Sequence, residues 1–146
     1  MAKVFANEDG NLSNRPITTT VRKSYSDIDC SFETKPSGDI YKKTDAAAVK
    51  QAVKNLLLTR RGEKPFNPYY GSGLYDLMFS ISTEVDAGDV SEYVVNTINN
   101  NEPRVRVLSV GTRFSPDYYS AEITVEFQVI NTLETTTVTV TISRNR

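Results

Sequence analysis

The chain has 146 residues, of which 38% are hydrophobic and 24% charged, a composition typical of one soluble globular domain. Its net charge of -1 gives no electrostatic reason to expect nucleic acid or an anionic membrane as a partner, and no apolar run approaches the length of a membrane span. The chain has one cysteine, Cys30, which excludes an internal disulfide. It has no histidine, which argues against zinc sites and Ser-His or Cys-His catalysis, and we expect no cofactor.

Residues 1–23 are rich in Asn, Asp, Gly, Ser and Pro at first, then contain a short β-prone patch, and show no helical period. Two interpretations stay open for them. One is a frayed terminus, and the other is an extended arm that becomes ordered against a partner. We therefore divide the chain into an N-terminal arm, residues 1–23, and a single domain, residues 24–146.

Residues 24–43 alternate aromatic or apolar residues with polar ones and break at Pro36-Ser37-Gly38. This pattern indicates irregular chain with a short strand that lies over the core. The expected anchors are Tyr25, Ile28, Phe32, Ile40 and Tyr41.

The first helix is predicted to begin after Thr44, a suitable N-cap, with Asp45 in the first turn, where the helix dipole favours a negative charge. Apolar residues recur at three- and four-residue spacing and predict one buried face, formed by Ala46, Val49, Ala52, Val53, Leu56 and Leu57. Arg60 and Arg61 are expected at the C-terminal end of the helix, with Gly62 as its stop.

The loop of residues 61–73 contains two prolines, three glycines and three aromatic residues. Such a loop is predicted to be ordered by rings packed into the core, with glycine where φ is positive or the backbone comes close. It lacks the Gly-Lys-Ser/Thr end of a phosphate-binding loop. A short helix is predicted over Leu74–Phe79, and a third helix from Ser82 or Thr83 to about Asn100.

Three strands are predicted after the last helix. Residues 105–114 break their alternation near Val107-Leu108, which indicates a β-bulge or a bend. Residues 121–129 and 135–143 alternate apolar and polar side chains, as half-buried antiparallel strands do. The order of elements predicts an α+β fold, in which two main helices and a short helix pack on a C-terminal three-stranded antiparallel β-meander.

The last helix and the sheet meet at residues 99–105, with the sequence Asn-Asn-Asn-Glu-Pro-Arg-Val. Pro103 fixes φ, lacks an N–H and pushes Glu102 out of helical geometry. Glu102 and Arg104 therefore lie beside a stiffened joint, either as solvated charges or as a partner-binding site. In the second interpretation Arg104 presents its planar fork to a carboxylate or to carbonyl groups, and Glu102 pairs with a partner cation or orients Arg104.

Without histidine, the enzymatic arrangement left to consider is a pair of carboxylates, as in glycoside hydrolysis. Glu122 and Glu126 share one face of the second predicted strand. That face is opposite the apolar one, so we expect both side chains to be solvated. The sequence therefore predicts no catalytic residues.

Four blocks resemble the baseplate wedge proteins of contractile phage tails that initiate the tail sheath, a family that also includes a baseplate component of type VI secretion. The blocks stand in family order and are residues 25–29 (YSDID), 57–71 (LLTRRGEKPFNPYYG), 74–79 (LYDLMF) and 101–105 (NEPRV). The similarity covers residues 24–143. The N-terminal segment extends beyond the compact form of the family, so its role does not follow from the resemblance.

The resemblance implies a structural protein and not an enzyme. It implies that Glu102, Pro103 and Arg104 bind the helical core bundle of neighbouring wedge subunits. It also implies that the β-meander, which resembles the interlocking domain of the sheath protein, templates the first sheath ring. The implied partners are wedge subunits and the tail sheath protein, with tail tube or hub proteins as further candidates. The implied location is the tail baseplate of the virion, in six copies around a six-fold axis, after assembly in the host cytoplasm.

The last predicted strand offers a mechanism for templating. An edge strand carries unpaired N–H and C=O groups, which can pair with an extended segment of a neighbour. The outward residues of the expected edge are Thr135, Thr137, Thr139 and Thr141. The alternative is an ordinary edge that is blunted by Arg144 and Arg146.

Two other functions stay open from the sequence. Members of this family are often labelled lysozymes, so a peptidoglycan-cleaving muramidase of the baseplate is one alternative. A soluble adaptor domain of the same fold is the other, because a fold does not fix a function.

Overall fold

The computed structural model describes residues 24–79, 86–115 and 120–143. Within these ranges a short antiparallel pair of strands, β1 (Ser26–Ile28) and β2 (Lys42–Thr44), precedes three helices and a second sheet. The helices are α1 (Asp45–Leu58), α2 (Leu74–Phe79) and α3 (Ala87–Asn101). The second sheet is antiparallel, with the order β3 (Val105–Phe114), β4 (Ser120–Val129), β5 (Thr135–Ser143). The predicted α+β fold is confirmed, and the predicted arm, residues 1–23, lies outside the described residues.

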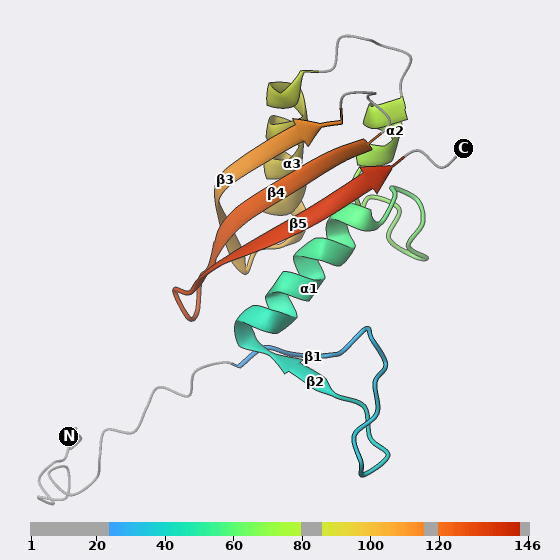
Figure 1. Ribbon diagram of the computed structural model, residues 1–146, viewed down its shortest axis with the longest axis vertical. Coiled ribbons are helices and arrows are strands. Elements are labelled where there is room, and N and C mark those ends of the chain that lie inside the picture. The colour runs from blue at the N-terminus through green and yellow to red at the C-terminus, as the bar shows by residue number, and fades with distance from the viewer. Residues whose placement is uncertain (1–23, 80–85, 116–119, 144–146) are drawn as a thin grey trace, which may run out of the picture.

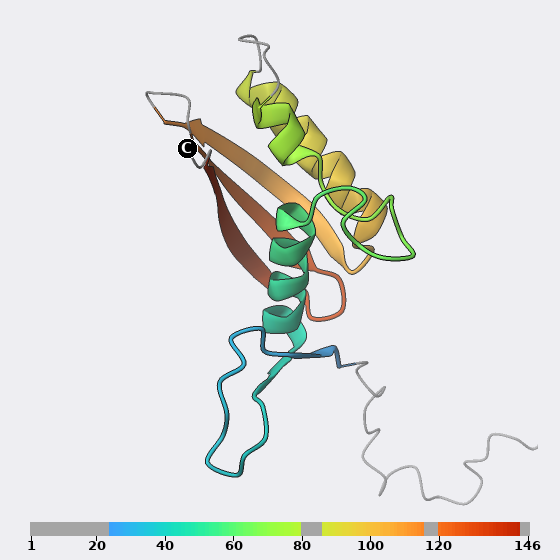
Figure 2. The ribbon, with the colours of Figure 1, turned by 90° about the vertical axis from the view of Figure 1, so that its right-hand side faces the viewer.

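The core lies between one face of the β3–β4–β5 sheet and the helices α1 and α3, which cover that same face (Figure 2). The alternation of β4 and β5 supplies the buried side of the sheet: Ala121, Ile123, Val125, Phe127, Val129, Val138, Val140 and Ile142. The helices supply the facing layer: Val49, Val53, Leu56 and Leu57 from α1, and Val90, Val94 and Ile98 from α3. The other face of the sheet carries the polar side chains, among them Glu122 and Glu126, as predicted. Glu122 is exposed, but Glu126 is half-buried and accepts a hydrogen bond from the hydroxyl of Ser109 (3.0 Å), so the predicted solvation holds fully for Glu122 alone.

Of the two irregularities predicted for β3, a bulge or a bend, the structure shows a bulge. Val107 pairs with Phe127 and Ser109 pairs with Glu126, so Leu108 is the extra residue and its side chain is exposed. A bulge of this kind bends the strand and increases its twist. The break in alternation that the sequence carries at this point is therefore a feature of the folded sheet.

The ends of α1 agree only in part with prediction. Thr44 has the extended backbone of an N-cap but makes no side-chain cap bond, and the side chain of Asp45 accepts a hydrogen bond from the backbone N–H of Tyr25 (3.2 Å). The helix ends at Leu58, so Arg60 and Arg61 lie beyond its last turn and the expected interaction with the helix dipole was wrong. Both guanidinium groups lie over tyrosine rings instead.

Helix α3 begins later than predicted. Asp86 has extended backbone and serves as the N-cap, with its carboxylate accepting from the N–H of Ala87 (2.6 Å). The predicted start residues, Ser82 and Thr83, lie outside the described residues. Asp86 was not among the predicted starts, because serine, threonine and aspartate are all good N-caps and periodicity alone does not choose among them.

The predicted anchors of residues 24–43 are wrong for three of the five side chains. Tyr25 packs against the core and Ile40 is half-buried, whereas Ile28, Phe32 and Tyr41 are exposed. The physical reason is that the far part of the chain between β1 and β2 projects away from the helices (Figure 1), while the part beside β1 meets α1 through polar contacts of Gln51 with Ile28 and Cys30 and not through apolar packing.

The loop between α1 and α2 is held by backbone contacts more than by buried rings. Gly71 has φ +110, and a Cβ there would lie 2.7 Å from the carbonyl oxygen of Thr59 and 2.8 Å from that of Arg60. Ser72 is fully buried, and its N–H and hydroxyl donate to the carbonyl groups of Thr59 (2.7 Å) and Leu57 (2.5 Å). Tyr70 packs against the core, but Phe66 and Tyr69 are exposed, so the predicted packing of all three rings was wrong.

Two glycine substitutions test this account of the loop. Gly71→Ala should lower the free energy of unfolding by roughly 2 kcal/mol or more, because strained backbone combines with a clash against two carbonyl groups. Gly62→Ala should lower it by about 1 kcal/mol, because φ is +83 but the space is open. Urea unfolding followed by circular dichroism measures both, and equal losses would contradict the close approach at Gly71.

Candidate partner-binding sites

The joint between α3 and β3 is fixed by backbone hydrogen bonds on both sides of Pro103. The N–H of Glu102 donates to Ile98 (2.8 Å) and closes the last turn of α3, and the N–H of Val105 donates to the carbonyl of Glu102 (3.3 Å). The carbonyl of Arg104 accepts from the N–H of Ile130, at the end of β4 (3.0 Å). The backbone that carries Glu102 and Arg104 is thus tied to both the helix and the sheet.

Glu102 and Arg104 form a bidentate ion pair with each other. The Nε and Nη2 atoms of Arg104 donate to the two carboxylate oxygens of Glu102, each at 2.6 Å. The side chain of Glu102 is 9% exposed, whereas that of Arg104 is 33% exposed. The hydrogen bond to Glu102 is the main reason why the pKa of Arg104 is raised above its ordinary value. Of the two roles considered for Glu102, the structure shows the one within the chain: it orients Arg104.

Two tyrosines from distant parts of the chain complete the surroundings of this ion pair. The guanidinium of Arg104 lies 5.2 Å from the centre of the Tyr25 ring, at the start of the hairpin. Burial raises the pKa of the Tyr70 hydroxyl, the charge of Glu102 raises it further, and Arg104 acts in the opposite direction. Sequence reasoning did not assign either tyrosine to the site. Both tyrosines stand in the sequence blocks that resemble the family, which could have marked them as important. The blocks do not indicate that the two side chains lie beside Glu102 and Arg104.

The β5 edge is the second candidate site, and hydrogen-bond register determines which of its N–H groups are free of β4. Val129 donates to the carbonyl of Glu134 (2.9 Å), and bonded and non-bonded pairs alternate along an antiparallel ladder. When this alternation is followed along the register, the backbone N–H groups of Val138 and Val140 point toward β4. The backbone N–H groups of the odd-numbered threonines of β5 point away from β4. The hydrogen bond from the N–H of Ser115 to the carbonyl of Ser120, between β3 and β4, gives the same result. It shows that the backbone groups of the even-numbered residues of β4 face β3, so those of the odd-numbered residues face β5.

The outward threonines therefore present both backbone and side chain to a neighbour. In the described sheet β5 pairs with β4 alone, so its second edge has no strand partner there. The side chains on this edge are exposed: Thr135, Thr137, Thr139 and Thr141. The buried Val138, Val140 and Ile142 hold the same strand to the core. The arrangement allows a strand to be added without any change in the fold.

The two candidate sites do not form one pocket. The joint precedes β3, whereas β5 lies at the opposite edge of the sheet, with β4 between them. The joint and the β5 edge are therefore two separate candidate sites.

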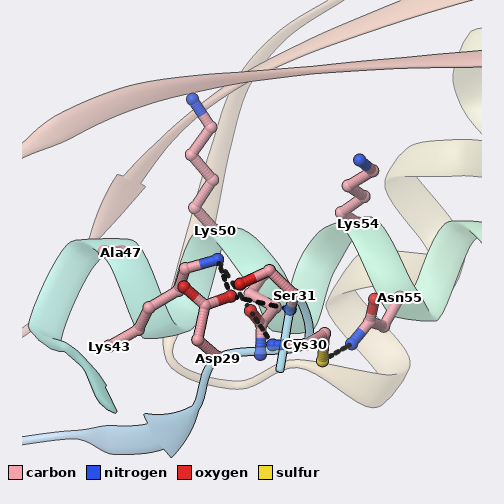
Figure 3. A pocket seen from close by; sticks show the side chains of 9 residues that line it. Asp29, Cys30, Ser31, Lys43, Ala47, Lys50, Lys54 and Asn55 are labelled. Atoms are coloured by element: carbon pink, nitrogen blue, oxygen red, sulfur yellow. Dashed lines mark hydrogen bonds and ion pairs between the residues drawn. The ribbon is translucent and has the colours of Figure 1, made fainter. Parts of the chain in front are cut away.

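A hollow of about 470 Å³ lies between the β1–β2 hairpin and α1 (Figure 3). Gln51 ties the two together: its amide donates to the carbonyl of Ile28 (2.7 Å) and accepts from the N–H of Cys30 (3.2 Å) and from Lys43 (2.9 Å). Lys43 also pairs with Asp29 at 2.8 Å, and its hydrogen bond is the main reason why the pKa of Asp29 is lowered, with the N–H of Ser31 second.

The lining of this hollow does not contain the pair of carboxylates that glycoside hydrolysis uses. Asp29 is the one acid among its lining residues, and Lys43 neutralises it. Lys50 and Lys54 extend away from that contact (Figure 3). The described residues contain no group of three or more acidic or cysteine side chains able to hold a metal ion, and their helices are too short or too polar to cross a membrane.

A family model described as "Baseplate wedge protein gp25" matches residues 43–137, which include the joint and the start of β5. The chain belongs to this family of structural baseplate proteins. Among its relatives, the baseplate wedge protein gp25 of Enterobacteria phage T4 is 29% identical over 111 residues, which cover 76% of this chain and 84% of the phage T4 protein.

Two solved structures of similar fold extend the comparison. A proposed tail lysozyme from Geobacter sulfurreducens is 25% identical, with a TM-score of 0.57, and the match covers 67% of this chain and 89% of that protein. A chain of the six-fold symmetrised anti-feeding prophage baseplate is 16% identical, also with a TM-score of 0.57, and the match covers 84% of this chain and 88% of that chain. At that identity the second match shows a common fold alone.

The ion pair at the joint makes a prediction about stability. Arg104→Ala leaves the carboxylate of Glu102 buried without its cation, and should lower the free energy of unfolding by about 1–3 kcal/mol. The double variant Glu102→Gln/Arg104→Ala should recover part of this loss, because no buried charge remains. Urea unfolding at neutral pH measures both. A stability of Arg104→Ala within about 0.5 kcal/mol of wild type would mean that the pair behaves as a surface ion pair.

Proposed function

We propose that the chain is a wedge component of a contractile-tail baseplate, which binds the wedge core bundle through Glu102, Pro103 and Arg104 and templates the first sheath ring by strand addition at β5. The family match over residues 43–137 carries this proposal, because it includes the joint. In this account six copies stand around the baseplate of the virion, in contact with wedge subunits and sheath protein, and with tube or hub proteins as further neighbours.

The joint suits a partner that offers acceptor groups on a rigid helical surface. Arg104 has five N–H donors, and Glu102 engages two of its nitrogens, so donors remain for a second acceptor. The guanidinium is already oriented by Glu102 and Tyr25, which reduces the entropy that binding must remove. Pro103 is exposed beside it and has no N–H to leave unsatisfied in the interface. Carboxylates or the free carbonyl groups at a helix C-terminus are the acceptors that this geometry fits.

Replacing Arg104 by lysine tests whether binding needs the planar guanidinium group or only its positive charge. Arg104→Lys keeps the positive charge beside Glu102 but loses bidentate geometry, and should sharply reduce the amount of this chain in purified baseplates. Arg106→Lys, at an exposed position on β3, is the matched control and should not reduce it. Mass spectrometry of purified baseplates measures the amount of each variant. Equal incorporation of the two variants would contradict the proposal that the joint binds the wedge core bundle.

The β5 edge suits an extended segment of the sheath protein. Its outward N–H groups supply main-chain bonds, and its threonine side chains favour strand geometry without an apolar surface that would promote aggregation. Because Val138, Val140 and Ile142 keep β5 in the core, the template is present before the sheath arrives.

A proline on this edge tests strand addition. Thr139→Pro removes an N–H that faces away from β4, so the protein should still fold, as checked by circular dichroism, while sheath polymerisation on its baseplates fails. Thr139→Val keeps the N–H and should allow sheath of normal length. Normal sheath on folded Thr139→Pro protein would show that this edge is not the template.

A baseplate muramidase is the second candidate, and the fold shared with a proposed tail lysozyme is the observation in its favour. Against it stands the position of Glu122 and Glu126, the two acids that share one face of β4. Both lie on the sheet face opposite the core and not in an apolar pocket, where the pKa of a general acid would be raised, and Glu126 accepts a hydrogen bond from the hydroxyl of Ser109 (3.0 Å). We expect the purified chain to leave peptidoglycan intact from acid to neutral pH in a clearing assay. Cleavage that is abolished by replacing one carboxylate would favour the muramidase instead.

A further inference from the structure

The loop before α2 carries two aromatic side chains that neither candidate site uses. Phe66 and Tyr69 are 106% and 86% exposed, the highest values among the exposed large hydrophobic residues of the described chain. Phe66 also has φ +64, a backbone conformation that residues other than glycine adopt rarely. A large apolar ring that is held in solvent on strained backbone is a reason to look for a function.

Contacts with the body of the protein hold this loop in place. Arg60 lies over the ring of Tyr75 in α2 (4.4 Å), and Arg61 lies over the ring of Tyr93 in α3 (5.6 Å). Within the loop, Lys64 lies 4.0 Å from the centre of the Tyr70 ring.

Backbone bonds close the same loop at its base. The N–H of Gly62 donates to the carbonyl of Pro68 (2.9 Å), and the N–H of Gly73 donates to the hydroxyl of Tyr93 (2.8 Å). Pro65 and Pro68 restrict the chain on both sides of Phe66. The exposed rings are therefore presented by an ordered scaffold and lose little entropy on binding.

We propose that Phe66 and Tyr69 form a docking knob that inserts into an apolar pocket with an acidic rim on a neighbouring baseplate protein. Aromatic anchors in pockets are the residues that most often dominate the energy of protein interfaces, and the Tyr69 hydroxyl suits the polar rim. The acidic rim follows from charge: the loop carries Arg60, Arg61 and Lys64. Its one acid, Glu63, accepts from the backbone N–H of Arg60 (2.8 Å).

The same charge argues against two other occupants. A second copy that docked through the same loop would bring two cationic loops together, which is unfavourable. Residues 1–23 of the same chain contain four basic and two acidic residues, so they also carry the same sign as the loop. A partner of opposite sign is the occupant that the chemistry favours.

Photo-crosslinking in assembled baseplates tests the knob. Benzoylphenylalanine replaces Phe66 in one variant and Phe32, an exposed ring on the β1–β2 hairpin, in a control that sets the background for an exposed position. We expect position 66 to crosslink, well above that background, to a different protein at a site lined by apolar and acidic residues. A crosslink to a second copy, to residues 1–23, or none above the background would overturn the proposal.

Serine substitutions supply the energetic test. The double variant Phe66→Ser/Tyr69→Ser should reduce incorporation into baseplates about tenfold or more, with Phe32→Ser unaffected. Unchanged incorporation of the double variant would overturn the knob. The inference rests on the proposed place in a baseplate, but the two proposals fail separately. If the wild-type chain is missing from purified baseplates, the proposed place is contradicted. If the wild-type chain is present but benzoylphenylalanine at position 66 forms no crosslink above background, the knob alone is contradicted.

Discussion

The buried carboxylate of Glu102 is the constraint on which the arrangement of this protein depends. A charge at 7% exposure needs a cation, and Arg104 supplies it from two residues away across Pro103. The same three residues end α3 through the N–H of Glu102 and hold the end of β4 through the carbonyl of Arg104. The guanidinium then reaches Tyr25, so one ion pair connects the last helix, the sheet and the hairpin. A sequence that satisfies all three contacts has little freedom at these positions.

The sheet was predictable because its signal is local. Strict alternation in β4 and β5 fixes which side chains are buried, and the single break in β3 marks the bulge at Leu108. The position of the joint was predictable from the sequence, but the partner of Glu102 was not. A glutamate two residues before an arginine can pair with that arginine or with a cation of a partner protein. That choice depends on burial, which the fold determines and the residue type does not.

Aromatic residues were the least predictable part of the chain. Tyr25 and Tyr70 pack on the core while Phe32, Phe66 and Tyr69 remain in solvent, although all five stand in similar polar surroundings in the sequence. Their fate depends on how far each loop projects and on cations such as Lys64, which lies over the ring of Tyr70. Contacts of this kind join residues by position in space and leave no periodic pattern. They nevertheless decide which surfaces a partner can reach.

We propose that the joint and the β5 edge both contact neighbours in an assembled tail. A cryo-electron microscopy reconstruction of baseplate and first sheath ring containing this chain would show both contacts at once. We expect an added strand paired along Thr135–Ser143 and an acceptor group from the wedge bundle within hydrogen-bonding distance of Arg104. A reconstruction in which the β5 edge faces solvent and Arg104 contacts its own chain alone would contradict it.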